Sequence, residues 1–149
     1  MKKKTTILII FIILIFSQLT INSCSNRQDT VSCFPNIPIN VSLNLNLPAY
    51  FNLTQSGGWV YVNEQQSGTR GLIIVRRSST TFMIYDRNAP HICPDTNTTL
   101  EVSDLSIVCP KDNAKWILLT GQPIAVAGVQ PKTYPYNYDP VSNILSIYN

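Results

Sequence analysis

The sequence predicts a small all-β domain, and three observations lead to that prediction. First, residues 41–47 alternate strictly between aliphatic and polar side chains, so the aliphatic ones would share one buried face of a strand. Second, short apolar runs recur between turn-forming residues, and the chain contains ten prolines, which interrupt helices. Third, no stretch of ten or more residues beyond the N-terminal segment has apolar residues at helical spacing.

Turn-forming residues mark the boundaries of the expected strands. Pro48 would end the first strand, and glycines precede the apolar runs at 59–62 and 72–75. Ser78-Ser79-Thr80 is the expected loop of a hairpin that continues into a strand at 81–85. The remaining expected strands are Thr98–Val102, Leu105–Val108, Lys115–Leu119, Tyr134–Asp139 and Ile144–Tyr148.

The first 23 residues are typical of a secretory signal peptide. Lys2, Lys3 and Lys4 precede an unbroken apolar run at 7–16, which is too short to cross a bilayer. The segment Ile21-Asn22-Ser23-Cys24 resembles a bacterial lipobox. That resemblance implies lipidation of Cys24 and a lipid-anchored protein of the bacterial cell envelope, facing the periplasm or the surface. The alternative is an ordinary secreted protein cleaved near Ser23.

The mature chain would consist of a polar tether, residues 24–40, and one domain, residues 41–149. The formal net charge of +3 includes the three lysines of the signal peptide, and without them eight basic and eight acidic side chains remain. A neutral chain without a basic cluster argues against nucleic acid as a partner. The lipid anchor makes the membrane the expected partner, and the sequence identifies no protein partner.

Two short stretches, Ala89-Pro90-His91 and Cys109-Pro110-Lys111-Asp112, carry the possible site chemistry. They resemble the ligand loops of Rieske iron–sulfur domains, in which Cys-x-His and Cys-x-x-His are separated by about 15 to 17 residues. Residues 92–108 form a spacer of 17 residues here. Asp86-Arg87 and the stretch at 119–123 extend the resemblance. It implies a small Rieske-like antiparallel β-sandwich or barrel with two ligand-type loops, covering roughly residues 41–149.

The resemblance leaves two of the four ligand positions without the family's residue type. Cys109 and His91 match, whereas Ala89 stands at the first Cys position and Asp112 at the second His position. A Rieske 2Fe-2S cluster binds one iron with two Cys and the other with two His, so each iron would keep one protein ligand. We therefore expect vestigial cluster positions and no cofactor.

Three cysteines remain besides Cys24, and an oxidising compartment favours a disulfide between two of them. Many Rieske domains link their two loops by a disulfide, and Cys93 lies near the cysteine of the first loop in that link. The resemblance therefore favours a Cys93–Cys109 disulfide with Cys33 as the free thiol. The pairings Cys33–Cys93 and Cys33–Cys109 remain open.

These features predict an envelope lipoprotein whose Rieske-like domain is a structural or binding module and not an enzyme. His91 is the only histidine, and no third group is identifiable that would orient it toward a nucleophile. The alternative is an electron-transfer protein that retains a 2Fe-2S cluster or another metal centre, such as tetrahedral zinc, at His91, Cys93, Cys109 and Asp112. The tight spacing of His91 and Cys93 argues against it. A weaker hypothesis is a regulatory or specificity subunit of an envelope enzyme.

Overall fold

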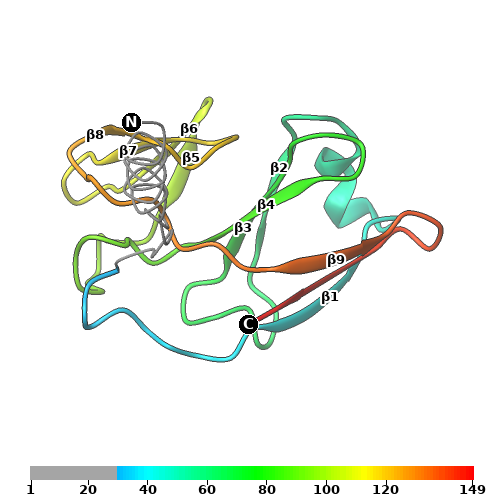
Figure 1. The fold of residues 1–149 in the computed structure, drawn as a ribbon, viewed down its shortest axis with the longest axis horizontal. Coiled ribbons are helices and arrows are strands. Elements are labelled where there is room, and N and C mark those ends of the chain that lie inside the picture. The colour runs from blue at the N-terminus through cyan, green and yellow to red at the C-terminus, as the bar shows by residue number, and fades with distance from the viewer. Residues whose placement is uncertain (1–29) are drawn as a thin grey trace, which may run out of the picture.

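The computed structural model describes residues 30–149, which form three antiparallel sheets and one 3₁₀-helix (Figure 1). The elements are β1 (Asn40–Asn44), η2 (Pro48–Thr54), β2 (Trp59–Val62), β3 (Leu72–Arg76), β4 (Phe82–Asp86), β5 (Glu101–Ser103), β6 (Ser106–Val108), β7 (Lys115–Ile117), β8 (Pro123–Ala125), β9 (Tyr136–Asp139) and β10 (Ile144–Tyr148). The expected signal peptide, Cys24 and the start of the tether lie outside the described residues. Within residues 30–149, no helix has the length and apolar character needed to span a bilayer.

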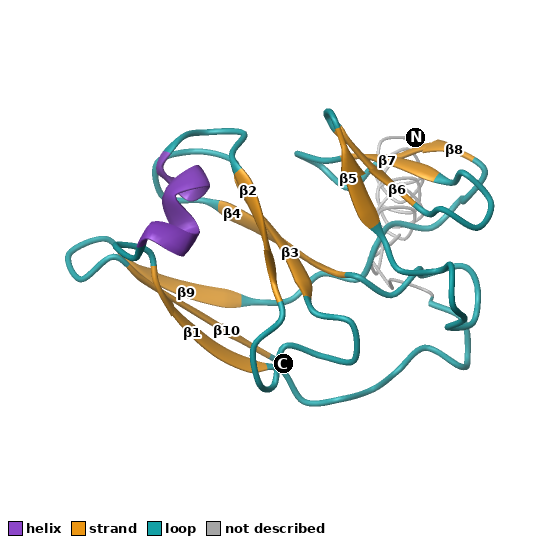
Figure 2. Ribbon diagram, turned by 180° about the vertical axis from the view of Figure 1, so that it is seen from behind, coloured by secondary structure: helices purple, strands orange, loops and turns teal. Residues whose placement is uncertain are grey.

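The strands form sheets in the orders β1-β10-β9, β2-β3-β4 and β5-β6-β7-β8, and every pairing is antiparallel. The four-stranded sheet lies at one end of the molecule, and the two three-stranded sheets lie at the other (Figure 2). The predicted all-β class with antiparallel sheets is therefore confirmed.

Strand β3 is buried on both faces, which explains its uninterrupted apolar sequence. Leu72 and Ile74 pack into a core shared with β1 and β10, where Leu43 and Leu145 also lie. The alternate residues Ile73 and Val75 belong to a second core, which contains Trp116 and the ligand-type loops. Because successive side chains of a strand point to opposite faces, the middle sheet separates the two cores. This sheet contributes side chains both to the core beside the ligand-type loops and to the core of the rest of the domain.

Several strands are shorter than the sequence predicts because local turns end them. Asn44 ends β1, since its side-chain oxygen accepts a hydrogen bond from the backbone of Asn46, and Leu47 is half exposed. Leu47 is instead the residue before η2, with Pro48 in its first turn, where a missing N–H is tolerated. Strand β7 ends at Ile117, whose carbonyl accepts hydrogen bonds from Thr120 and Gly121. The sequence analysis did not predict η2 or β8.

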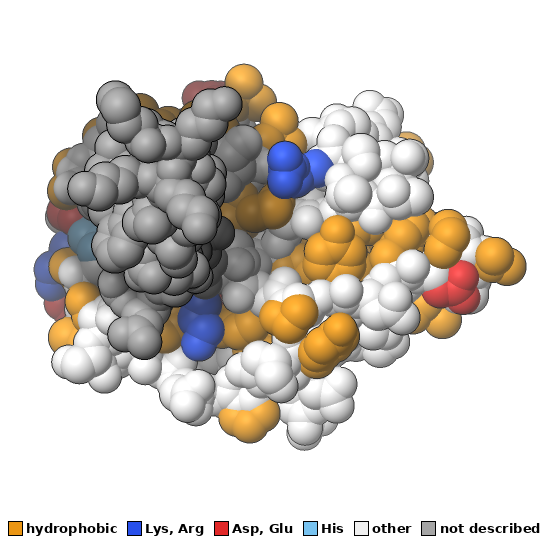
Figure 3. Space-filling model, in the orientation of Figure 1, with side chains coloured by type: hydrophobic (Ala, Val, Ile, Leu, Met, Phe, Trp, Pro, Cys, Tyr) orange, Lys and Arg blue, Asp and Glu red, His pale blue; other side chains and the backbone are white. Residues whose placement is uncertain are grey.

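The described part of the expected tether is held against the domain. Ile39 is buried, and its backbone N–H donates to the side chain of Asn149 at the other end of the chain. Val31 donates to the carbonyl of Pro90 at 2.9 Å. On the visible part of the face in Figure 3, Lys and Arg side chains form no single patch, and those at the left edge lie beside acidic side chains.

Candidate functional site

The first ligand-type loop follows β4 and is anchored by a buried carboxyl group. Asp86 ends β4, and its Oδ1 accepts hydrogen bonds from the backbone N–H and the side-chain amide of Asn88, at 2.7 and 2.8 Å. Its Oδ2 accepts the hydroxyl of Tyr134 at 2.6 Å. Burial and the neighbouring Asp86 carboxyl raise the pKa of Tyr134 well above its ordinary value, so the phenol stays protonated and keeps donating. These bonds fix the direction in which residues 87–93 leave the sheet.

The second ligand-type loop is the tight connection between β6 and β7. The backbone N–H of Cys109 donates to the carbonyl of Ala114, and Asn113 donates to the carbonyl of Cys109, both at 2.9 Å. Asn113 has a φ of 60°, a left-handed conformation that asparagine adopts more readily than most residues. Oδ1 of Asp112 accepts the backbone N–H of Ala114 at 3.1 Å, which leaves Oδ2 to face the first loop.

The two loops meet through their side chains. Nε2 of His91 and Oδ2 of Asp112 lie 2.6 Å apart, and Lys111 pairs with the carboxylate of Asp95. The His91 ring also packs at a tilt beside Trp116, with ring centroids 5.5 Å apart. The two ligand-type loops therefore face one another at His91 and Asp112.

His91, Cys109 and Asp112 converge closely enough to share one ion. One ligand atom from each of the three lies within 4.8 Å of the other two. Cys109 is fully buried in the second core beside Ala89, whereas the side chains of His91 and Asp112 keep 14% and 27% of their surface exposed. The group is therefore open to solvent on its histidine and carboxylate side and closed on its sulfur side.

The surroundings shift the protonation of the thiol and the carboxyl in opposite directions. Burial raises the pKa of the Cys109 thiol, and a hydrogen bond with the nearby Asp112 carboxyl raises it further. Burial also acts to raise the pKa of Asp112, but hydrogen bonds from His91, Ala114 and Cys109 outweigh it and hold the pKa below its ordinary value. Without an ion, a protonated thiol therefore lies beside an ionised carboxylate.

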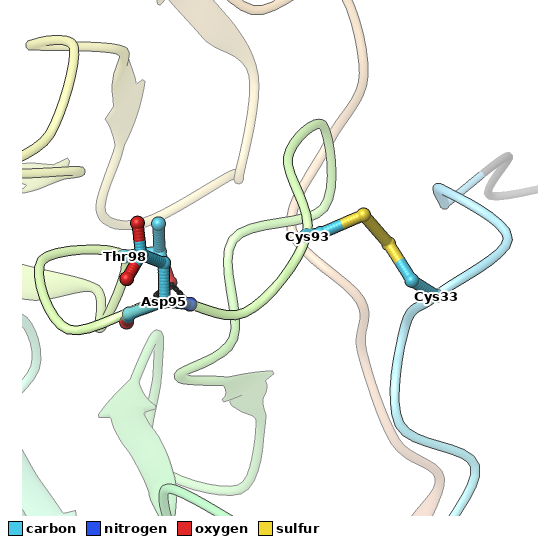
Figure 4. The surroundings of a disulfide bond; sticks show 4 residues. All are labelled: Cys33, Cys93, Asp95 and Thr98. Carbon is cyan, nitrogen blue, oxygen red and sulfur yellow. Dashed lines mark hydrogen bonds between the residues drawn. A yellow bond between two sulfur atoms is a disulfide. The ribbon is translucent and has the colours of Figure 1, made fainter.

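The favoured disulfide Cys93–Cys109 was wrong. Cys93 is bonded to Cys33, 60 residues earlier in the chain, and the two Cα atoms lie 5.5 Å apart. Figure 4 shows Cys93 on the first loop and Cys33 on the N-terminal segment that runs alongside it. Cys109 is instead the free thiol, because its side chain points into the second core. The pairing Cys33–Cys93, which the sequence left open, is the one observed.

That disulfide also changes the candidate ligand set. The sequence offered His91, Cys93, Cys109 and Asp112 as four donors, but the sulfur of Cys93 is bonded to Cys33 and is not available as a thiolate. Three of the four candidate donors are brought together, and Cys93 is not one of them.

Sequence reasoning missed the ion pair that links Asp95 to Lys111. Asp95 begins a turn in which its backbone N–H donates to Oγ1 of Thr98 and the backbone of Thr98 donates back to its carbonyl. The Asp-x-x-Thr spacing after Pro94 is a turn signal that could have located Asp95 at the loop surface. Nothing in the sequence indicated that Lys111 would be its partner.

The residues of the site do not fit a Rieske 2Fe-2S cluster. Ala89, which the resemblance aligns with the first Cys ligand, is buried in the same core as Cys109 and has no donor atom. Asp112 lies at the position of the second His ligand, and its Oδ2 is hydrogen-bonded directly to the remaining histidine. The cluster needs four thiolate and imidazole donors, and these positions supply two.

Comparison with known proteins identified similar folds but no family. No family model matches the chain, and no curated protein matches it. One similar solved structure is the ferredoxin of carbazole 1,9a-dioxygenase from Nocardioides aromaticivorans IC177, with 16% identity, a TM-score of 0.42, and coverage of 75% of this chain and 97% of that one. Another is a complex of reduced oxygenase and oxidised ferredoxin in carbazole 1,9a-dioxygenase, with 16% identity, a TM-score of 0.44, and coverage of 76% and 94%. These similarities assign no function, which has to be inferred from the residues of the site.

Proposed function

We propose that this chain is an envelope lipoprotein whose Rieske-like domain lacks a 2Fe-2S cluster and serves as a structural or binding module, not as an enzyme. The hydrogen bond between His91 and Asp112 is the observation that carries the proposal. It joins the two loops at the place where the resemblance would put an iron ligand. Hydrogen bonds to the ligands of a metal site orient ligands that are already present, and they do not replace the donor that Ala89 lacks.

The bonds that hold the two loops together support the proposal that the loops keep their arrangement without a cluster. The disulfide of Cys93 fixes the first loop to the N-terminal segment, and the Asp95–Lys111 and His91–Asp112 pairs connect the loops. The loop pair thus keeps its arrangement through side chains of this chain alone. An electron-transfer role with a 2Fe-2S cluster is the alternative, and the donor set disfavours it.

The membrane is the proposed partner, reached through lipid on Cys24. Replacing this cysteine tests that part separately. Full-length protein with Cys24→Ser is expected in the soluble fraction and without lipid by mass spectrometry, whereas wild-type protein partitions into the membrane. A variant that remains lipidated, or a wild-type chain without lipid, would exclude the anchor.

Metal analysis of the full chain tests the loss of the cluster. The protein is purified in mild detergent under anaerobic conditions, and its iron, acid-labile sulfide and visible spectrum are measured. We expect a colourless protein with substoichiometric iron. A brown protein with about two irons and two sulfides per chain would overturn the proposal.

A further inference from the structure

We infer that His91, Cys109 and Asp112 form a binding site for one divalent transition-metal ion of the zinc class. This inference rests on the proposed absence of a 2Fe-2S cluster, because a cluster would occupy His91 and Cys109. It adds a metal-binding activity to the proposed module and narrows the zinc alternative from four candidate donors to three. It is independent of the lipid anchor.

The spacing of the donor atoms suits a single ion. Bonds of about 2.0 to 2.3 Å to nitrogen, oxygen and sulfur place tetrahedral donors roughly 3.3 to 3.8 Å apart. The three ligand atoms of the site already lie within 4.8 Å of one another. Nε2 of His91 and Oδ2 of Asp112, now 2.6 Å apart, are closer than two donors on one ion, so an ion that both ligate requires them to separate slightly.

The backbone around the donors is held in place before an ion binds. Asp112 uses Oδ1 to hold the second loop through Ala114, so Oδ2, which contacts the candidate ligand His91, is the oxygen available to an ion. The first loop is fixed close to His91 by the hydrogen bond from Val31 to Pro90 and by the disulfide at Cys93. Such outer contacts pre-organise ligands and raise metal affinity.

The charge and chemistry of the donors also match a zinc-class ion. An imidazole, a thiolate and a carboxylate are the three ligand types found in zinc sites. The thiolate and the carboxylate together neutralise a divalent cation, which avoids an uncompensated buried charge. Binding would release the thiol proton of Cys109 to solvent, since the thiolate is the ligand. The partly exposed side of His91 and Asp112 leaves the fourth position to water.

The arrangement without an ion leaves one polar atom unsatisfied. Nδ1 of His91 is buried, and within residues 30–149 it has no hydrogen-bond partner. A buried ring nitrogen without a partner is unfavourable. Either ring nitrogen of histidine can ligate a metal, so an ion bound at Nδ1 would give this atom the partner that it lacks.

Titration with cobalt(II) chloride tests the site, because cobalt(II) takes the place of zinc and reports a bound thiolate by its absorption. The full chain in detergent is freed of metal with a chelator and titrated anaerobically. We expect a near-ultraviolet thiolate-to-cobalt charge-transfer band that saturates at one cobalt per chain and disappears when zinc chloride displaces the cobalt. Absence of this band, whether or not cobalt binds, would overturn the inference.

Three variants and one control identify the ligands. Cys109→Ser should abolish the charge-transfer band, and Asp112→Asn and His91→Gln should each weaken cobalt binding by more than about 100-fold, since even outer-shell changes cost 10- to 100-fold. Asp104→Asn removes an exposed carboxylate of the turn between β5 and β6, outside the site, and should bind as wild type. Unchanged binding in Asp112→Asn and His91→Gln would overturn the assignment.

A thermal measurement separates lost binding from lost folding. Excess zinc chloride should raise the melting temperature of wild type and of Asp104→Asn, because an ion that binds only the folded state stabilises it. It should not raise the melting temperature of Asp112→Asn, whose circular dichroism shows whether it is folded. Equal shifts in all variants would contradict the site. A colourless protein that does not bind cobalt would contradict this inference and would remain consistent with the proposed loss of the cluster.

Discussion

His91 and Asp112 lie 21 residues apart in the sequence and are joined across the gap between two loops by a hydrogen bond of 2.6 Å from Nε2 to Oδ2. The histidine comes from the loop after β4 and the carboxylate from the turn between β6 and β7. Each loop is fixed separately, the first through Asp86 and the second through the backbone of Cys109. Because each loop is fixed by its own contacts, the distance between His91 and Asp112 depends on how the sheets position the two loops.

Loss of the Cys33–Cys93 disulfide should strongly destabilise the domain. Cys33→Ser or Cys93→Ser opens a link that spans 60 residues, which the chain-entropy model values at about 4 kcal/mol. The double variant should be about as stable as either single one, because each removes the same bond. Chemical denaturation with and without a reducing agent measures this, and the reductant should affect wild type only.

Peptide mapping provides the direct check on the pairing. Digestion without reduction should yield the peptide of Cys33 linked to that of Cys93, and Cys109 should react with an alkylating reagent only after unfolding. A peptide linking Cys93 to Cys109 would contradict the structure.

Gly121→Ala should destabilise the domain by about 1 to 3 kcal/mol, through backbone strain at a positive φ and a tight contact. Gly121 has a φ of 70°, and an added Cβ would lie 3.0 Å from Cε1 of Tyr85, a fully buried ring whose hydroxyl donates to Leu118. Gly128→Ala is the matched control, since its Cβ would meet nothing within 4 Å. Urea denaturation of both variants measures the difference, and equal stabilities would contradict the expected strain.

Tyr134→Phe should lower the free energy of unfolding by about 1 to 3 kcal/mol. The change removes the hydroxyl that donates to Asp86 at 2.6 Å and leaves a buried carboxyl oxygen without that donor. Because the same carboxyl holds Asn88, amide hydrogen exchange should also accelerate in the first loop. Tyr148→Phe, at an exposed position of β10, serves as the control and should leave both measurements unchanged.

Lys111→Ala should raise the pKa of Asp95, with little effect on the melting temperature at neutral pH, because exposed ion pairs contribute little stability. The hydrogen bond from Lys111 is the main cause that lowers this pKa from 3.8 to about 2, and the backbone of Thr96 adds to it. The pKa should therefore rise toward 3.8 without reaching it.

The pH dependence of stability follows from the sign of that shift. A carboxyl with a lowered pKa stabilises the fold above its ordinary pKa, and it loses this contribution as the pH falls from about 3.8 to 2. Lys111→Ala should make that loss smaller. Carboxyl-carbon NMR titration measures the pKa, with Lys115→Ala as the control, and an unshifted Asp95 in Lys111→Ala would refute the pairing.

The strand pattern of this chain was readable from the sequence because it depends on local periodicity. The alternation of Val41, Leu43, Leu45 and Leu47 predicted one buried face; the first three are buried, and Leu47 is exposed because β1 ends before it. The two loops were also identifiable, because the residues at 89–91 and 109–112 and the 17-residue spacer resemble the ligand loops of Rieske domains. The turns that shorten β1 and β7 were missed, because single side-chain and carbonyl contacts decide them.

The sequence by itself determined the all-β class, the two ligand-type loops, and the absence of two of the four Rieske ligand types, since these depend only on which residues are present and how they are spaced. Only the tertiary structure decided which cysteine bonds to Cys93 and which donors converge on one point. A disulfide or a shared ion requires atoms within a few ångströms, and that proximity arises from sheets packing residues 30–40 and 109–112 against the first loop. Sequence distance carries no such information for residues 60 positions apart.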